Sequence, residues 1–193
     1  MRPYTKVARA EAEDRTRTAL LDAAEAAFLG DGWDKASLGT LAATAGVTKP
    51  TLLRHFGSKQ GLLEQAYRRG FARVRDQRFA TPVGDVAGAV DNLLDHYEEH
   101  GDEALKIGAM GGDEPIAGLV RNAKQTHYEW VDHAFGAWLD RLGGAERIRV
   151  RAALISLCDV QTWAIMRRDL GLAHRDARAA LVLAIERILE EDA

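Results

Sequence analysis

The segment from residue 37 to residue 59, SLGTLAATAGVTKPTLLRHFGSK, constrains the fold of this chain more than any other. Ser37 can cap a first helix, and Gly46 supplies a turn conformation that residues with a Cβ atom resist. Thr48 can cap a second helix, and Pro50 fits its first turn, where a missing N–H costs little. The segment therefore predicts two short helices joined by a tight turn.

The second of these helices has two chemically different faces. Leu52 and Phe56 are four residues apart and share one face, whereas Thr51 and Arg54 point roughly the opposite way. The first face can pack against other helices, and the second stays free. A helix-turn-helix places its second helix in the major groove of DNA, so the segment predicts sequence-specific DNA binding.

The candidate DNA contacts lie on or beside the second helix. Lys and Arg side chains can donate to guanine edges or phosphates, a Thr offers its hydroxyl or methyl group, and a His at the far end suits the DNA backbone. A third helix begins after Ser58, with Lys59 in its first turn. A cation at this position opposes the helix dipole, and a bound DNA phosphate would account for it. The candidate residues are Ser37, Thr48, Lys49, Pro50, Thr51, Leu53, Arg54, His55 and Lys59.

A longer stretch around this segment has a family resemblance. The sequence TALLDAAEAAF from Thr18, followed by GDGWDKASLGTLAATAGVTKPTLLRHFGSKQGLL from Gly30, resembles the N-terminal domain of the tetracycline-repressor (TetR) family of bacterial regulators. In that family a Tyr usually stands where this chain has Leu53, and its hydroxyl contacts a DNA phosphate. The resemblance thus implies that this contact is absent here. Trp33 in place of the usual Tyr or Phe is a milder difference.

Length and composition favour an all-α protein. The chain has 193 residues, few prolines, abundant alanine and no alternating β-branched runs. No window is long and apolar enough to span a membrane, and the N-terminus lacks the apolar core of a signal peptide. The single Cys158 suits a reducing compartment. We therefore expect a cytoplasmic protein without contact to a membrane.

Charge is divided unevenly along the chain. Residues 1–80 carry 14 Lys and Arg against 9 Asp and Glu, a net +5, whereas residues 81–193 carry 12 against 20, a net −8. This assigns DNA contact to the first part. A flexible basic arm that reaches phosphates or the minor groove is one interpretation of the N-terminus, and a solvated tail is the other. The basic residues concerned are Arg2, Lys6, Arg9, Arg15 and Arg17.

The predicted organisation is a three-helix DNA-binding domain over residues 1–59, with its basic arm, and a larger helical bundle over residues 60–193. Glycines and prolines divide the bundle, and Gly101 is taken as the end of one helix. The predicted helices cover residues 58–79, 83–100, 104–110, 114–142, 145–170 and 176–191.

The last two predicted helices are the expected homodimer interface. The run from Ala179 to Ile185 is apolar almost all round, as expected for a helix covered on more than one side. Small residues on the preceding helix, such as Ala152 and Ser156, allow close approach, so two copies can build a four-helix interface. Burial within one subunit is the alternative. A dimer would read a palindromic operator with two related helices.

The family resemblance also implies a small-molecule pocket in the C-terminal bundle. The candidates are aromatic and soft side chains, although such residues at helical spacing usually just pack in a core. The four Trp of the chain favour an apolar ligand, either aromatic or otherwise hydrophobic. The candidate residues are Tyr97, Met110, His127, Trp130, Phe135, Trp138, Trp163 and Met166.

These observations predict a transcriptional repressor that a small-molecule effector releases from its operator. A helical ligand-binding or adaptor protein that has lost DNA binding is the alternative, and Leu53 supports it. His96 and His100 have a spacing that can hold a metal, but no partner pair follows, and a solvated helix face is the preferred interpretation. No catalytic arrangement stands out, so neither enzymatic activity nor a cofactor is expected.

Overall fold

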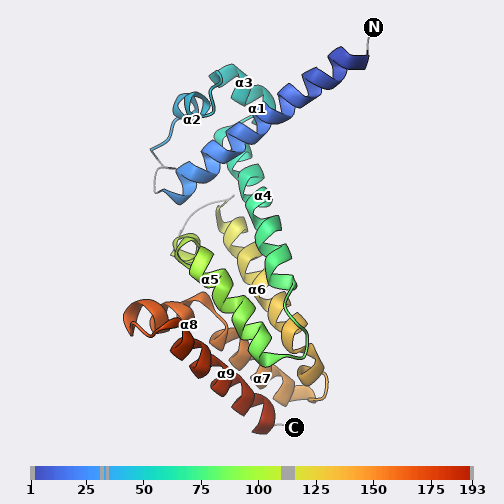
Figure 1. Ribbon diagram of the computed structural model, residues 1–193, viewed down its shortest axis with the longest axis vertical. Coiled ribbons are helices and arrows are strands. Elements are labelled where there is room, and N and C mark those ends of the chain that lie inside the picture. Colours follow the sequence, from blue (N-terminus) through green and yellow to red (C-terminus); the bar gives the residue numbers. More distant parts are fainter. Residues whose placement is uncertain (1–2, 31–32, 34, 110–115, 192–193) are drawn as a thin grey trace. The chain divides into compact units, whose positions relative to one another are not determined.

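The computed structural model describes residues 3–30, 33, 35–109 and 116–191, and every regular element within these ranges is a helix (Figure 1). The predicted all-α class is confirmed. The chain forms two compact units, Met1–Ala72 and Arg73–Ala193. The division falls within a long helix, later than the boundary predicted after Lys59, because the first turns of that helix belong to the N-terminal core.

The N-terminal unit contains α1 (Pro3–Leu29), α2 (Leu38–Thr44), α3 (Lys49–Phe56) and the first part of α4 (Lys59–Phe79). Helix α2 lies beside both α1 and α3. The helices meet in one small apolar core, to which each contributes side chains that are withdrawn from water. Its most buried members are Leu20, Ala24, Leu41, Ala42, Leu52 and Leu62.

The basic residues near the N-terminus belong to helix α1 in the structure, whereas a flexible arm was one of the two predictions. Helix α1 starts at Pro3 and contains no later glycine or proline that would interrupt it. Arg17 lies over the ring of Phe56, with its guanidinium carbon 5.2 Å from the ring centroid, and donates a hydrogen bond to Gln65. Arg17 therefore contacts α3 and α4 at the surface, and it is exposed, as are Arg9 and Arg15. Arg2 lies outside the described residues.

The C-terminal unit contains α5 (Val86–Ala109), α6 (Ile116–Leu139), α7 (Gly144–Leu157), α8 (Val160–Ala164), the short π-helix η1 (Ile165–Asp169) and α9 (His174–Glu191). Helix α5 lies beside α6, α8 and α9, and α7 lies beside α6 and α9 (Figure 1). The helices enclose an apolar core rich in large side chains, among them Leu93, Leu94, Trp130, Phe135, Leu154, Trp163 and Ile185.

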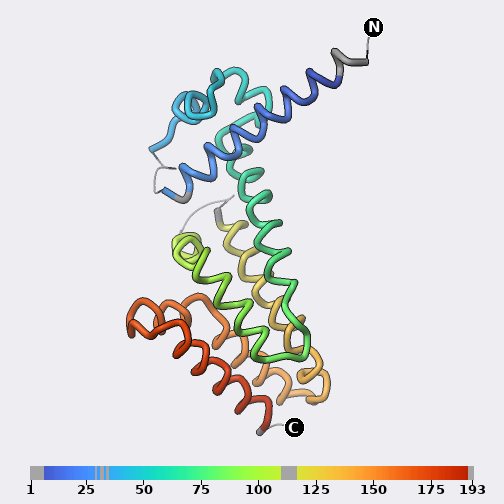
Figure 2. Tube along the Cα trace, in the orientation of Figure 1, coloured from blue at the N-terminus to red at the C-terminus, as the bar shows by residue number. Residues whose placement is uncertain are grey.

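Helix α5 continues through Gly101, so the predicted stop at this glycine was wrong. The trace of residues 86–109 is one unbroken coil (Figure 2). Gly101 is buried, and a Cβ atom built on it would lie 2.5 Å from a ring carbon of Trp163. The glycine therefore admits the indole ring of Trp163 against the helix backbone and does not end the helix.

The predicted helix over residues 145–170 is divided into three parts. Helix α7 ends at Leu157, and the carboxylate of Asp159 then caps α8 by accepting a hydrogen bond of 2.8 Å from the backbone N–H of Gln161. An Asp that can cap a new helix is the signal that could have revealed this break. The chain then widens into the π-helix η1, a form that often marks functional segments.

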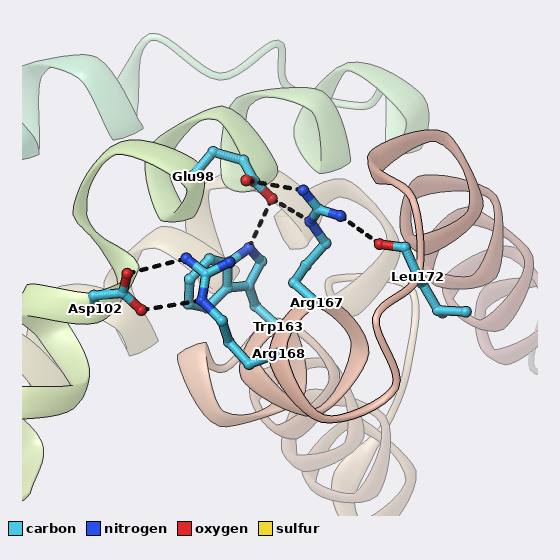
Figure 3. Close-up of polar contacts among 6 residues, drawn as sticks. All are labelled: Glu98, Asp102, Trp163, Arg167, Arg168 and Leu172. Atoms are coloured by element: carbon cyan, nitrogen blue, oxygen red, sulfur yellow. Dashed lines mark hydrogen bonds and ion pairs between the residues drawn. The ribbon is translucent and has the colours of Figure 1, made fainter.

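The π-helix directs two consecutive arginines to two acidic residues of α5 (Figure 3). Arg167 donates to both carboxylate oxygens of Glu98, at 2.5 and 3.1 Å. Arg168 pairs in the same way with Asp102, at 3.2 and 3.0 Å. The indole N–H of Trp163 donates to Glu98 at 3.1 Å, so the ring that packs on α5 is also held by its polar atom. This network fixes η1 and α8 against α5.

Candidate nucleic-acid interface

Side chains and one turn fix the positions of α2 and α3. Ser37 Oγ accepts a hydrogen bond of 3.0 Å from the N–H of Thr40, and Thr48 Oγ1 accepts one of 3.4 Å from the N–H of Thr51, so both predicted caps are confirmed. Gly46 has a φ of 69°, which glycine adopts without the strain that a Cβ atom adds. Local sequence therefore determines the geometry of this helix-turn-helix.

Helix α3 has a buried face and an exposed face. Leu52 and Phe56 are 0% and 6% exposed, which confirms the packing face that the sequence predicts. Lys49, Pro50 and Arg54 are exposed on the remainder of the helix. The buried pair anchors the helix, and the exposed side chains present a cationic surface to a partner.

The residues on and beside the exposed face of α3 differ in whether their polar groups already have hydrogen-bond partners within the protein. Lys49 and Arg54 form no ion pair or hydrogen bond with other side chains of the described residues. The hydroxyls of Thr48 and Thr51 lie 3.0 Å apart and share a hydrogen bond. Nε2 of His55 is covered and has no hydrogen-bond partner, so a contact to the DNA backbone would have to use its other ring nitrogen. Leu53 is partly exposed beside them.

Lys59 is engaged within the N-terminal unit. Its ammonium donates to the backbone carbonyl of Trp33 and lies 4.7 Å from the centroid of the Trp33 ring. Ser58 caps α4 as predicted, because its Oγ accepts a hydrogen bond of 2.9 Å from the N–H of Gly61. Sequence reasoning missed the pairing of Lys59 with Trp33, since the two lie far apart in sequence. The phosphate contact of Lys59 stays a prediction.

An ion-pair cluster holds the middle of α4 on α1. Arg69 donates to Glu25 at 2.9 Å and to Asp22 at 2.5 Å. The hydrogen bond that Arg69 donates to Glu25 is the largest cause of the raised pKa of Arg69. This cluster joins α4 to α1, and no short-range sequence pattern predicts it.

Most of the predicted ligand residues lie in the core of the C-terminal unit. The side chains of Tyr97, Trp130, Trp163, Met166 and His127 are buried, and Phe135 is fully buried beside them, whereas Trp138 is partly exposed. Met110 lies outside the described residues.

Tyr97 and Trp130, two of these aromatic side chains, use their polar atoms in hydrogen bonds within the unit. Tyr97 donates to the carbonyl of Cys158 at 2.9 Å. Trp130 Nε1 donates to the carbonyl of Arg78 and to the hydroxyl of Thr81, both at 3.0 Å. Sequence reasoning missed Arg78 itself, whose buried side chain lies among these rings.

His96 is buried rather than part of a solvated face, so that interpretation of the His96 and His100 pair was wrong for His96. Burial, with the nearby charge of Arg78, lowers the pKa of His96 to about 3. In the ranges that the structure describes, no group of three or more His, Cys, Asp or Glu side chains is placed to hold a metal ion. Nor does any helix there have an apolar stretch long enough to cross a membrane.

A capped helix-turn-helix with a cationic exposed face, on a chain with a second and larger helical unit, is typical of helix-turn-helix transcription regulators. Residues 20–66 match the family model of the bacterial regulatory proteins of the tetR family. For these residues, the match agrees with the TetR-family resemblance that the sequence indicates.

Comparison with solved structures extends the similarity of fold to the whole chain. Eight chains match. One is the crystal structure of a TetR-family regulator from Streptomyces coelicolor, with a TM-score of 0.53 and 21% sequence identity over 92% of this chain and 96% of that chain. No curated protein sequence matches significantly. The chain thus has the fold of a TetR-family regulator, which supports DNA-binding transcription regulation.

Proposed function

We propose that this protein is a transcriptional repressor that binds a palindromic operator as a homodimer and is released by a small-molecule effector in its C-terminal unit. The observation that carries the proposal is the exposed face of α3, where Lys49, Thr51 and Arg54 project from a helix anchored by Leu52 and Phe56. Such a protein acts in the cytoplasm, where its DNA target lies. The effector must prefer one of two conformations to change DNA binding.

The proposed DNA contacts give a direct mutational test. Thr51→Ala and Arg54→Ala are each expected to weaken operator binding by about 1 to 3 kcal/mol, if the side chain reads a base. Fluorescence anisotropy with a labelled operator at fixed salt measures this. Arg175→Ala is the matched control, because Arg175 is an exposed arginine in the C-terminal unit. Unchanged affinity in both α3 variants would refute the assigned face.

Leu53 offers a test by gain of affinity, which rests on the family resemblance. Leu53→Tyr is expected to tighten operator binding about fivefold, since a hydroxyl bonded to phosphate contributes about 1 kcal/mol or more. Leu53→Phe adds the ring without the hydroxyl and is the matched control. Equal affinities of the Tyr and Phe variants would contradict the hydroxyl contact. The alternative, a ligand-binding or adaptor protein without DNA binding, would be favoured only if neither variant nor the parent binds any operator.

The proposed dimer uses α7 and α9, the helices that overlap the predicted ranges 145–170 and 176–191. Helix α9 buries Ala177, Leu181 and Ile185 against its own unit, but Leu183 is 59% exposed on another face. Ile148 of the neighbouring α7 is 70% exposed. Burial within one subunit accounts for the first set of residues and leaves these two apolar side chains in water. A second copy of the chain would cover them.

Disrupting this surface tests the dimer. Leu183→Glu is expected to convert the dimer to monomer at micromolar concentration, because a charge would be buried against an apolar partner surface. Light scattering after size-exclusion chromatography measures the mass. Val83→Glu is the matched control, since Val83 is also exposed, at 58%, but precedes α5. A Leu183→Glu protein that stays dimeric would place the interface elsewhere.

A further inference from the structure

Arg78 is a buried cation in the C-terminal unit, near the end of α4. The residue is only 5% exposed, and among the described arginines it alone is buried. A charged side chain is rarely buried without a partner of opposite charge, because its lost hydration must be offset. The contacts of the Arg78 guanidinium therefore bear directly on its role.

Among the residues that the structure describes, this guanidinium contacts only neutral groups. Nη2 lies 3.4 Å from Nδ1 of His127, whose Nε2 lies 2.9 Å from the carbonyl oxygen of Ile155. A carbonyl only accepts, so Nε2 carries the proton and Nδ1 accepts from Arg78. The guanidinium carbon lies 4.7 Å from the ring centroid of Trp130 and 5.6 Å from that of Tyr97. No Asp or Glu oxygen of the described residues forms an ion pair with Arg78.

Two nitrogen atoms in this cluster have no hydrogen-bond partner. They are Nε of Arg78 and Nδ1 of His96, and both residues are 5% exposed. Burial lowers the pKa of His127, and the charge of Asp159 opposes this lowering only in part. The Asp159 carboxylate, however, caps α8 through Gln161. A buried polar group without a partner calls for a functional or ligand-based explanation.

We propose that the Arg78 guanidinium binds the carboxylate of the effector, and that this effector carries an apolar body of about the size of an aromatic ring. The assignment rests on the proposed effector binding by the C-terminal unit. Guanidinium groups bind carboxylates through two parallel N–H donors, and Nε of Arg78 is an unused donor. One buried cation balances one carboxylate, and the faces of Trp130 and Tyr97 suit an apolar body.

The close packing around Arg78 links binding to a change of conformation. Trp130 and Tyr97 are buried against the guanidinium, so a bound carboxylate has to separate these side chains. A ligand that enters only after such a rearrangement prefers the rearranged state, which is what a change in DNA binding requires. Arg78 also belongs to α4, the helix whose first residues lie in the N-terminal unit.

Matched pairs of small molecules test the proposal on the full-length protein. The probes are benzoate, phenylacetate and indole-3-acetate, each compared with its neutral amide, and binding is followed by tryptophan fluorescence and by the shift of the melting temperature. At least one carboxylate is expected to bind ten times more tightly than its amide. Arg78→Met is expected to bring the ratio of carboxylate affinity to amide affinity close to one. Arg75→Met is the matched control, because Arg75 is an exposed arginine of the same helix, and it should keep the ratio.

Two further measurements keep the test decisive if Arg78→Met does not fold. Arg78→Lys retains a charge but loses the two-donor fork, and it should lower the ratio at least threefold. In the unaltered protein, the solvent-protected arginine Nε–H signal should shift on addition of the carboxylate and stay in place with the amide. A ratio near one for every pair, or an unchanged ratio in a folded Arg78 variant, would overturn the proposal.

The test of carboxylate binding and the test of DNA binding can fail independently of each other. If the Arg78-dependent preference appears but no DNA duplex is bound, the carboxylate site stands and the repressor assignment falls. If an operator is bound but no carboxylate preference appears, the carboxylate site falls and the DNA-binding assignment stands.

Discussion

Replacing Gly101 with alanine is expected to lower the free energy of unfolding of the C-terminal unit by about 2 to 3 kcal/mol, since overpacking a core typically costs this much. The added Cβ would lie 2.5, 2.6 and 2.9 Å from three ring carbons of Trp163. The ring cannot easily move away, because Trp163 is 1% exposed and its indole N–H is bonded to Glu98 (Figure 3). The loss should exceed the helix-propensity gain of about 1 kcal/mol from Gly to Ala.

Chemical denaturation monitored by tryptophan fluorescence and circular dichroism measures this effect. Gly136→Ala is the matched control, because Gly136 is also inside a helix of the C-terminal unit and a Cβ there would meet no atom within 4 Å. The control is expected to be neutral or stabilising by up to about 1 kcal/mol. If Gly101→Ala is as stable as this control, the indole ring does not pack on the backbone of α5 as described.

Acidification is expected to destabilise the C-terminal unit strongly, with His96 as a main cause. Burial, followed by the charges of Arg78, His100 and His127, lowers the pKa of His96 to about 3, from 6.5 in the unfolded chain. The folded protein therefore holds His96 neutral, and its contribution is fully present above pH 6.5 and is lost as the pH falls toward 3. Between pH 6.5 and pH 4 the loss should reach about 3 kcal/mol, at 1.36 kcal/mol per pKa unit.

Comparison with a variant isolates this contribution from that of the carboxylates. His96→Gln should show a shallower decline of unfolding free energy between pH 6.5 and pH 4 than the parent protein. His174→Gln provides the control, because His174 is a partly exposed histidine of the same unit. An equal decline in the parent and in His96→Gln would show that His96 is not held neutral by burial.

The DNA-binding unit could be predicted closely from the sequence because its determinants are local. Ser37, Thr48 and Ser58 act as caps on the helices that directly follow them, and Gly46 provides the turn between α2 and α3. These effects depend on residues within one or two turns, so a short sequence window contains the needed information.

The features that could not be predicted depend on contacts between distant residues. Gly101 resembles a helix stop in sequence, and only the position of Trp163 explains a glycine inside α5. The sequence does not reveal that Lys59 donates a hydrogen bond to Trp33. It also suggests a surface position for Arg78 in the last turn of α4, whereas the side chain is buried. A side chain at a helix surface is exposed or buried according to which helices cover it, and local pattern does not determine that choice.

Selection of bound duplexes from a random DNA pool by the purified protein, in moderate salt that suppresses nonspecific attraction to phosphates, tests the central claim most directly. The account predicts enrichment of an inverted repeat whose half-sites are centred about 34 to 36 Å apart, or a multiple of this, and loss of enrichment in the Arg54→Ala protein. A folded protein that enriches no sequence would contradict the assignment of α3 as a DNA-reading helix.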